Sequence, residues 1–399
     1  MTRVERLGDH VDVVTGFPFK SHDYAESGIR LLRGDNIGQG RIRWSGAKYW
    51  PENRADESTR FLLSAGDVVL AMDRPWIEAG LKYAAVAESD LPCLLVQRVA
   101  RLRAKKELTQ PFLPYLVGSR PFVDYILGVQ TGTGIPHISV GQIRDFRFPW
   151  VPISDQQAIA EVLGALDDKI ALNERSRSTG LELASACYEA AERNGQPELI
   201  GDLATLFDGP HATPQKTSEG PWFLSISSLK GGYLDLAESA HLSEDDFPRW
   251  TRRVQPQAGD VLFSYETRLG DAALMPAGVR GSLGRRMAVL RSKSASLSGA
   301  LLLHAYLAPA FQEEIKRRTI HGATVDRLPL KEMPGWRIQL PPTGDRERLS
   351  AKLDALHNSV MQTATENRTL ADLRDTLLPQ LITGKLRVKD AARIVEDEV

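Results

Sequence analysis

The sequence has few cysteines and no long apolar run. Only Cys93 and Cys187 occur among 399 residues. Two cysteines are too few for a disulfide framework or a cysteine-rich zinc site, and their apolar surroundings suit small core side chains. No stretch of 18 apolar residues exists, and no apolar segment follows the charged N-terminus "MTRVERLGDH". The sequence therefore predicts neither a membrane span nor a secretory signal, and we expect a cytoplasmic protein.

Net charge is also nearly absent, at −1. This argues against a protein that coats nucleic acid without specificity, because such binding comes mainly from neutralising phosphates. The charges are not evenly spread: residues 1–153 carry 20 basic and 17 acidic groups, 197–342 carry 17 and 16, and 154–196 carry 4 and 8. Local basic faces are therefore possible in the first two segments.

Catalytic motifs are missing as well. There is no Walker A pattern, HExxH, Gly-x-Ser-x-Gly or Cys-x-x-Cys, and no methyltransferase signature. The eight histidines show no metal-ligand spacing, so no metal site is expected. Asp260, Glu266 and Arg268 resemble the cluster of a metal-dependent nuclease, but arginine replaces the usual lysine and cannot readily lose its proton. Charged strand ends are the favoured interpretation, and a standalone nuclease stays an alternative.

What the sequence does contain is an internal repeat. "RLGDHVDVVTG" (6–16) aligns with "LIGDLATLFDG" (199–209), and "SAGDVVLAMD" (64–73) aligns with "QAGDVLFSYE" (257–266), both at a shift of 193. "TGTGIPHISVGQIRDFRFPWVP" (131–152) pairs with "HGATVDRLPLKEMPGWRIQLPP" (321–342) at a shift of 190. Few residues are identical, but the order of features is kept, so the chain is built from two copies of one plan.

Each copy combines a strand-rich head with a long helix. Short apolar runs between turn residues predict strands, and the pattern after each proline pair or proline turn predicts a helix. Ser154 and Gln157 form an expected capping box at the start of the first helix. The second helix is expected to begin at Thr343 or Asp345 and to end near Gly384. The predicted class is α+β, with segments 1–153 (first head), 154–196 (first helix), 197–342 (second head), 343–385 (second helix) and 386–399 (acidic tail).

Both helices carry the four-three apolar spacing of a coiled coil. A shift of 190 maps one apolar seam onto the other, and polar residues interrupt each seam at matched places. This predicts antiparallel packing in which the polar groups face each other, whereas the alternative is that each seam belongs to a separate core. Roughly 40 residues would give a rod of about 60 Å. The first seam contains Leu163, Leu166, Ile170, Asn173 and Arg177, and the second contains Leu353, Leu356, Val360, Thr363 and Asn367.

The ordered combination of head, helix, head and helix closely resembles a known family. The phrases that carry the resemblance include "LLRGDNIGQGRI", "TGTGIPHISVGQIRDFRFPWVPISDQQAIAEVLGALDDKIALNERS", "DGPHATPQKTSEGPWFLSISSLKGGYLD" and "LRDTLLPQLITGKL". The sequence is similar to the specificity subunit of Type I restriction-modification systems, HsdS, over nearly its whole length. No single short motif is diagnostic.

That resemblance implies a fold and a function. Each head would be a target recognition domain for one half of a split sequence in double-stranded DNA, and the helices would form an antiparallel coiled coil that sets the gap. Two modification (methyltransferase) subunits would bind this chain, and restriction/translocase subunits would join them. The chain itself would not catalyse a reaction, because S-adenosylmethionine, ATP and Mg would belong to the partner subunits.

The candidate DNA contacts are loop residues that can donate hydrogen bonds to phosphates or to base edges. We expect Arg33→Ala and Arg268→Ala each to affect one half-site only. A protein-binding helical scaffold or adaptor is the other alternative, because the near-neutral net charge does not exclude it. The candidates in the first head are Lys20, Arg33, Asn36, Arg41, Arg43, Arg74, Thr131, Thr133 and His137; those in the second are His211, Thr213, Lys216, Ser227, Lys230, Arg268, Arg285, Arg286 and Thr324.

Overall fold

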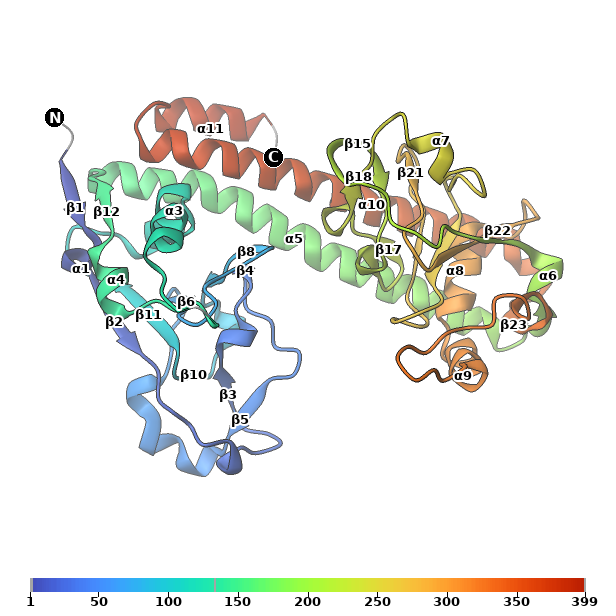
Figure 1. Ribbon diagram of the computed structural model, residues 1–399, viewed down its shortest axis with the longest axis horizontal. Helices are drawn as coiled ribbons and strands as arrows, with labels where there is room; N and C mark the ends of the chain where they lie inside the picture. The colour runs from blue at the N-terminus through green and yellow to red at the C-terminus, as the bar shows by residue number, and fades with distance from the viewer. Residues whose placement is uncertain (1–2, 133, 398–399) are drawn as a thin grey trace. The chain divides into compact units, whose positions relative to one another are not determined.

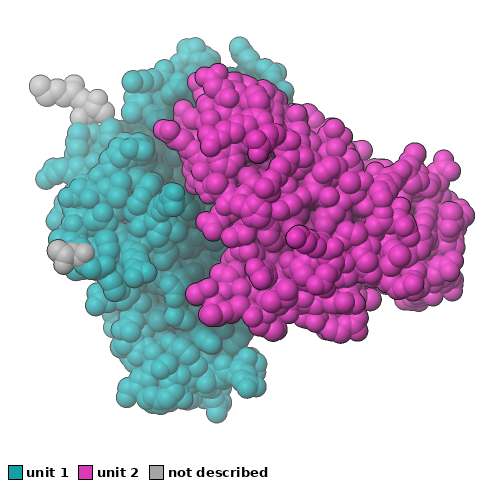
Figure 2. Space-filling view, turned by 45° about the vertical axis from the view of Figure 1, so that its right-hand side comes forward, with its two compact units in different colours: residues 1–169, 370–399 teal, residues 170–369 magenta. Residues whose placement is uncertain are grey.

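The computed structural model describes residues 3–132 and 134–397 (Figure 1). The chain forms two compact units, coloured separately in Figure 2. The first comprises residues 1–169 and 370–399, and the second comprises residues 170–369. Each unit therefore contains one head together with part of both long helices, so the boundaries between the units fall inside the helices.

The first head is built on a five-stranded sheet in the order β2-β11-β6-β9-β4, beside a three-stranded sheet, β10-β3-β5. All four residues of β6 are apolar and fully buried, which explains its uninterrupted apolar run, whereas β11 buries Val99, Ala100 and Leu102 and also carries Arg101 and Arg103. The strands are β1 (Val4–Arg6), β2 (Val11–Thr15), β3 (Ile29–Leu32), β4 (Gln39–Gly40), β5 (Lys48–Trp50), β6 (Val68–Ala71), β7 (Trp76–Ile77), β8 (Gly80–Leu81), β9 (Tyr83–Ala85), β10 (Cys93–Leu95), β11 (Val99–Ala104) and β12 (Arg147–Pro149); the helices are α1 (Leu7–His10), α2 (Leu113–Gly118), α3 (Arg120–Val129) and α4 (Val140–Asp145).

The second head has a four-stranded sheet, β14-β22-β19-β20, and a three-stranded sheet, β18-β15-β21. Helix α8 is buried along almost its whole length and contributes to the largest core cluster of this unit. The strands are β13 (Gln196–Leu199), β14 (Ala204–Asp208), β15 (Thr217–Phe223), β16 (Leu229–Lys230), β17 (Tyr233–Leu234), β18 (Ala240–His241), β19 (Val261–Ser264), β20 (Ala272–Leu274), β21 (Gly281–Ser282), β22 (Met287–Ser292) and β23 (Arg337–Leu340); the helices are α6 (Ile200–Leu203), α7 (Phe247–Trp250), α8 (Gly299–Leu307) and α9 (Pro309–Arg318).

The two heads repeat one topology, which confirms the internal repeat. The antiparallel series β2-β11-β6-β9 of the first head corresponds to β14-β22-β19-β20 of the second. In the smaller sheets, the parallel pair β3-β10 corresponds to the parallel pair β15-β21. The first and the last strand of each head also pair with each other in antiparallel fashion, β1 with β12 and β13 with β23. Two heads that share few residues thus have the same order of strands in their main sheets.

A buried ion pair explains the repeated Ala-Gly-Asp motif. The carboxylate of Asp67 is 2% exposed, accepts a hydrogen bond from the Ser64 amide at 2.8 Å and pairs with both guanidinium arms of Arg103. Asp260 makes the same contacts in the second head, with the Gln257 amide at 2.8 Å and with Arg291. The motif therefore shapes a turn and ties it to the neighbouring strand.

The long helices are α5 (Ile153–Glu192) and α10 (Thr343–Ile382), each of 40 residues. They pack antiparallel: in the first unit Asp167 of α5 pairs with Arg374 of α10 at 2.8 Å. In the second unit the carbonyl of Ile170 accepts a hydrogen bond from the Asn367 side chain at 3.2 Å. The apolar seam residues Leu163, Leu166, Leu353 and Val360 are buried, and Ile170 and Leu356 are half-buried.

The expected cap of the first helix is wrong by two residues. Helix α5 begins at Ile153, so Ser154 lies inside the helix, and its hydroxyl contacts Asp155 at 3.3 Å. The carbonyl of Pro152 instead accepts the first hydrogen bonds, from the amides of Asp155 and Gln156. Gln156 is fully buried and bonds to the Thr109 amide at 2.8 Å, so this position anchors the helix to the first head.

The sequence predicts that the polar residues of the two seams face each other, and Asn173 and Asn367 each bond to the opposite helix. Asn173 donates to Glu366 at 2.9 Å, and Thr363 bonds to carbonyls of its own helix. Arg177 lies over the ring of Tyr233 in the second head, 4.4 Å from its centre. The polar layer exists, but adjacent residues and the head supply the partners, because long side chains reach past the position directly opposite.

The acidic tail contains a helix that the sequence reading does not identify. Helix α11 (Val388–Glu396) follows a turn at Gly384 and lies beside the end of α10 (Figure 1). Its Ala391 and Val395 side chains are buried. Apolar residues four apart on an otherwise charged segment are the signal that could have predicted it.

Candidate functional site

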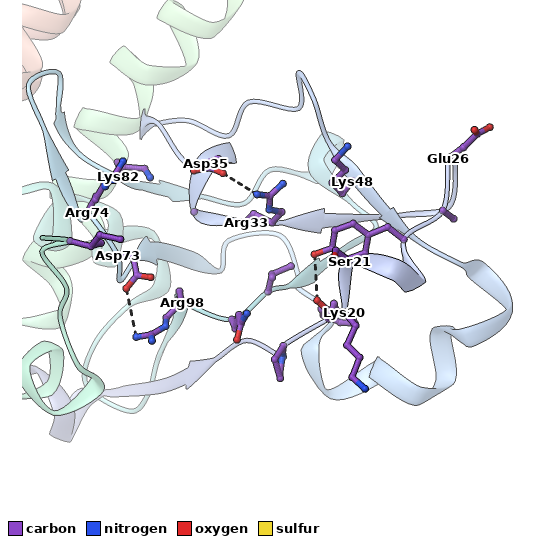
Figure 3. Close-up of a pocket in the computed structure, with 18 residues that line it drawn as sticks. Lys20, Ser21, Glu26, Arg33, Asp35, Lys48, Asp73, Arg74, Lys82 and Arg98 are labelled. Atoms are coloured by element: carbon purple, nitrogen blue, oxygen red, sulfur yellow. Dashed lines mark hydrogen bonds and ion pairs between the residues drawn. The ribbon is translucent and has the colours of Figure 1, made fainter.

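The first head contains a basic cleft of about 1040 Å³. Six basic and three acidic side chains line it, so its walls carry a net positive charge. Figure 3 shows two groups of charged residues that line the cleft. One contains Asp73, Arg74, Lys82 and Arg98, and the other contains Lys20, Glu26 and Lys48. The charged lining residues are Lys20, Arg33, Lys48, Arg74, Lys82 and Arg98, with Glu26, Asp35 and Asp73.

Strand ends and turns of the first head place these residues. Asp73 and Arg74 follow β6, and Arg98 directly precedes the neighbouring strand β11. Arg98 pairs with Asp73 at 3.7 Å, and Arg33 pairs with Asp35 at 3.1 Å (Figure 3). Burial, together with the positive charge of Arg74, lowers the pKa of Lys82, while Asp35 and Asp73 oppose that shift. The cleft is thus a mixed field in which cations outnumber carboxylates.

Of the candidates predicted for the first head, Lys20, Arg33 and Arg74 line this cleft. The Thr131 hydroxyl bonds to the His137 ring at 3.2 Å, and His137 forms a bridge with Asp73, so this loop borders the cleft. Arg41 and Arg43 are exposed but do not line it. Thr133 lies outside the described residues.

Asn36 does not suit the predicted DNA contact. Its side chain is 5% exposed, accepts a hydrogen bond from the Arg33 amide at 3.1 Å and donates to the Arg43 carbonyl at 3.0 Å. Both polar ends are therefore occupied inside the turn. Asn36 is a structural residue that shapes the loop carrying Arg33.

In the second head, His211 and Arg286 come together. Arg286 contacts the His211 ring at 3.3 Å and pairs with Glu266 at 3.0 Å. His211 also bonds to Asp208 at 2.9 Å, and Arg253 reaches the same carboxylate at 3.4 Å. A backbone bridge between Glu266 and Arg327 brings the loop that contains Thr324 beside this cluster. The group occupies the strand ends that correspond to those of the first cleft.

The other candidates of the second head are distributed more widely. Arg268 pairs with Asp271 at 2.5 Å, and burial raises the pKa of Asp271 while Arg268 and Lys230 oppose that shift. Lys230 is therefore close to this pair, on β16. Ser227 bonds to Ser225 at 2.7 Å within its own turn. The remaining candidates, Thr213, Lys216 and Arg285, are exposed.

Sequence reasoning missed Lys48, Lys82 and Arg98 in the first cleft. A signal for Arg98 was present, because "QRVARLR" (97–103) aligns with "RRMAVLR" (285–291) at a shift of 188. Lys48 and Lys82 have no such marker, since Lys48 begins β5 and Lys82 lies between β8 and β9, and only folding brings these separate segments to the cleft.

The suspected nuclease cluster is not assembled. Asp260 is committed to Arg291, Glu266 to Arg286, and Arg268 to Asp271. Within residues 3–132 and 134–397, no three histidine, cysteine, aspartate or glutamate side chains converge in a way that could hold a metal ion. Nor does any helix in that part of the chain have the length and apolar character needed to span a membrane.

Comparison with known proteins gives the class. Residues 9–183 match the family model of the Type I restriction modification DNA specificity domain. The chain is 35% identical to the EcoAI specificity subunit of Escherichia coli over 191 residues, which is 47% of this chain and 32% of that protein. It is 31% identical to the MjaVIII specificity subunit of Methanocaldococcus jannaschii over 175 residues, covering 44% and 41%. These alignments span less than half of either relative.

The fold extends the likeness over almost the whole chain. The S subunit of a Type I restriction-modification system from M. genitalium has a similar fold, with a TM-score of 0.54, 14% identity and coverage of 95% of both chains. The chain is therefore similar to Type I restriction-modification specificity subunits, in sequence over residues 9–183 and in fold over 95% of its length.

Proposed function

We propose that this chain recognises DNA for a Type I restriction-modification complex. Each head reads one half of a bipartite target, and the antiparallel helices set the gap between the halves. The observation that carries this is the repetition of one topology in two heads with different loop residues, because such heads present comparable surfaces of different chemistry. The two half-sites therefore differ in sequence, and the target is asymmetric.

The partners and the division of chemistry follow from that role. Two modification subunits bind this chain, and restriction/translocase subunits complete the nuclease. The described part of the chain offers no metal cluster. We propose that this chain contributes recognition alone, while S-adenosylmethionine, ATP and Mg act in the partner subunits.

The direct test is methylation by the complex of this chain with its modification subunits. Duplexes in which either half of the target is scrambled should not be methylated. Arg33→Ala should relax discrimination in one half and Arg268→Ala in the other, because the two residues belong to different heads. Uniform weakening of both halves by either variant would contradict separate recognition. The affinity for a random duplex, measured at several salt concentrations, tests the adaptor alternative. A protein-binding adaptor would show no linear fall of log affinity with log salt concentration.

A further inference from the structure

Both heads carry an acid–arginine pair at the same corner of the main sheet. A shift of 193 maps Asp73 onto Glu266, and a shift of 188 maps Arg98 onto Arg286. The backbone agrees: the Met72 amide donates to the Arg98 carbonyl at 2.8 Å, and the Tyr265 amide donates to the Arg286 carbonyl at 3.2 Å. Each pair therefore occupies one structural position in two heads that share few residues.

Both arginines have a left-handed backbone conformation. The φ angle is 66° at Arg98 and 67° at Arg286, a region that non-glycine residues rarely adopt. Glycine would occupy this corner without strain. Strain of this kind persists where the surrounding structure enforces it, and it is concentrated at functional sites. Two arginines at matched strained positions indicate that the side chain is needed there.

Stability does not account for the pair in the first head, whereas the Arg286 and Glu266 side chains of the second are 30% and 16% exposed. The side chains of Arg98 and Asp73 are 64% and 39% exposed, and an ion pair in such surroundings contributes little. Asp67 of the neighbouring Asp67–Arg103 pair is by contrast 2% exposed and holds a turn. The same head thus contains one structural pair and one pair that faces the cleft.

Resting on the proposed function, we infer that Arg98 and Arg286 each read a guanine, one in each half-site, and that Asp73 and Glu266 orient them. A guanidinium fork matches the N7 and O6 acceptors of guanine in the major groove. The neighbouring carboxylate points to a base edge and not to a phosphate, because it would repel a phosphate but would fix the direction of the fork. In the second head, the contact with His211 holds Arg286 from another side.

The experiment uses the full chain with its modification subunits and a library of random duplexes, from which bound molecules are sequenced. Arg98→Ala should lower the preference for one guanine of one half-site by about 10- to 100-fold and leave the other half unchanged. Arg286→Ala should do the same in the other half. Exposed arginines outside both corners, Arg120 and Arg317, provide matched controls, and replacing either by alanine should leave both halves unchanged.

Further variants separate the preference for guanine from the effect of charge on affinity and from the effect of the substitution on folding. Arg98→Lys keeps the charge but loses the fork, so it should lose the guanine preference and retain affinity for unrelated duplex. Asp73→Asn should weaken the same preference without lowering that affinity. Arg98→Gly should melt no lower than the parent chain, because it relieves the left-handed strain, and should still lose the preference.

Two failures are distinguishable. If the parent complex selects no bipartite sequence, the proposed function itself fails. If the parent selects one but Arg98→Ala and Arg286→Ala leave every base preference intact, only the assignment of these residues is overturned. A third outcome is that Asp73→Asn raises the affinity for all duplexes equally and leaves every base preference unchanged. Arg98 would then contact a phosphate, and its assignment to guanine would be overturned.

Discussion

At the scale of residues, the most informative comparison is between aspartates that stand six residues apart. Asp67 is buried, caps a turn and neutralises Arg103, whereas Asp73 is partly exposed at the cleft. Removing a buried carboxylate leaves its amide and guanidinium donors unpaired, which costs far more than removing an exposed ion pair. The two positions therefore separate a residue that stabilises the fold from one that the further inference assigns to recognition.

We expect Asp67→Ala and Asp260→Ala each to lower the free energy of unfolding by about 2–3 kcal/mol. Asp73→Ala should change it by less than about 0.5 kcal/mol. Urea unfolding followed by circular dichroism measures all three. Equal losses for Asp67→Ala and Asp73→Ala would remove the distinction between the two pairs.

At the scale of elements, each head is joined to the long helices by a different polar contact. In the first unit, Tyr115 of α2 donates to Asp167 at 2.8 Å, and Asp167 pairs with Arg374. A shift of 190 maps Asp167 onto His357. In the second unit, the Nε2 atoms of His357 and His304 of α8 lie 2.9 Å apart in a hydrogen bond, and both rings are at most 3% exposed. The charged contact at Asp167 in one copy thus corresponds to the contact between two histidines in the other.

The histidine joint should make the second unit sensitive to acid. Burial, and for His304 also the neighbouring His357, lowers the pKa of His304 to about 3 and burial lowers that of His357 to about 4, from 6.5. Both pKa values are depressed in the folded chain, so stability is fully present above pH 6.5. Below that pH the unfolded chain binds protons that the folded chain excludes, so stability falls as the pH drops from 6.5 toward the lowered pKa values of the folded chain.

Denaturant unfolding at pH 7.5, 6 and 5, with hydrogen exchange of residues 299–307 to localise the effect, measures this dependence. The double variant His304→Leu with His357→Leu should flatten it, because the buried rings no longer titrate. His321→Gln is the control, since that ring is 78% exposed. An unchanged slope in the double variant would show that other groups cause the acid sensitivity.

Sequence patterns predict these elements better than the contacts between them. The four-three spacing gives α5 and α10 to within a few residues, because burial of an apolar stripe depends on local periodicity. It does not give the partner of Asn173, which is Glu366, or of Arg177, which is Tyr233. Those partners depend on side-chain reach and on a neighbouring head. For the same reason the cleft residues Lys48 and Lys82, which come from separate segments of the first head, could not be predicted.

At the scale of the whole molecule, the proposed function makes the paired helices the element that sets the gap between half-sites. Two bonds of the polar layer at their middle join one helix to the other: Asn173 bonds to Glu366, and Asn367 bonds to the carbonyl of Ile170. Residues 170–176 and 364–370 enclose all four groups. Removing both segments therefore deletes one heptad from each helix and leaves none of these polar groups without its partner.

This double deletion should shorten the preferred gap by about 3 base pairs. Seven residues at 1.5 Å rise correspond to about 10 Å, and a base pair rises about 3.4 Å. A heptad also keeps the apolar seam in register, with a drift of only about 20° per helix, so each head should keep its own half-site. Methylation of duplexes with stepwise changed gaps measures the shift. In the control, the polar seam residues of the two heptads are replaced by apolar residues without changing the length of either helix, and this variant should keep the original gap. If the double deletion also keeps the original gap, the helices do not set the spacing.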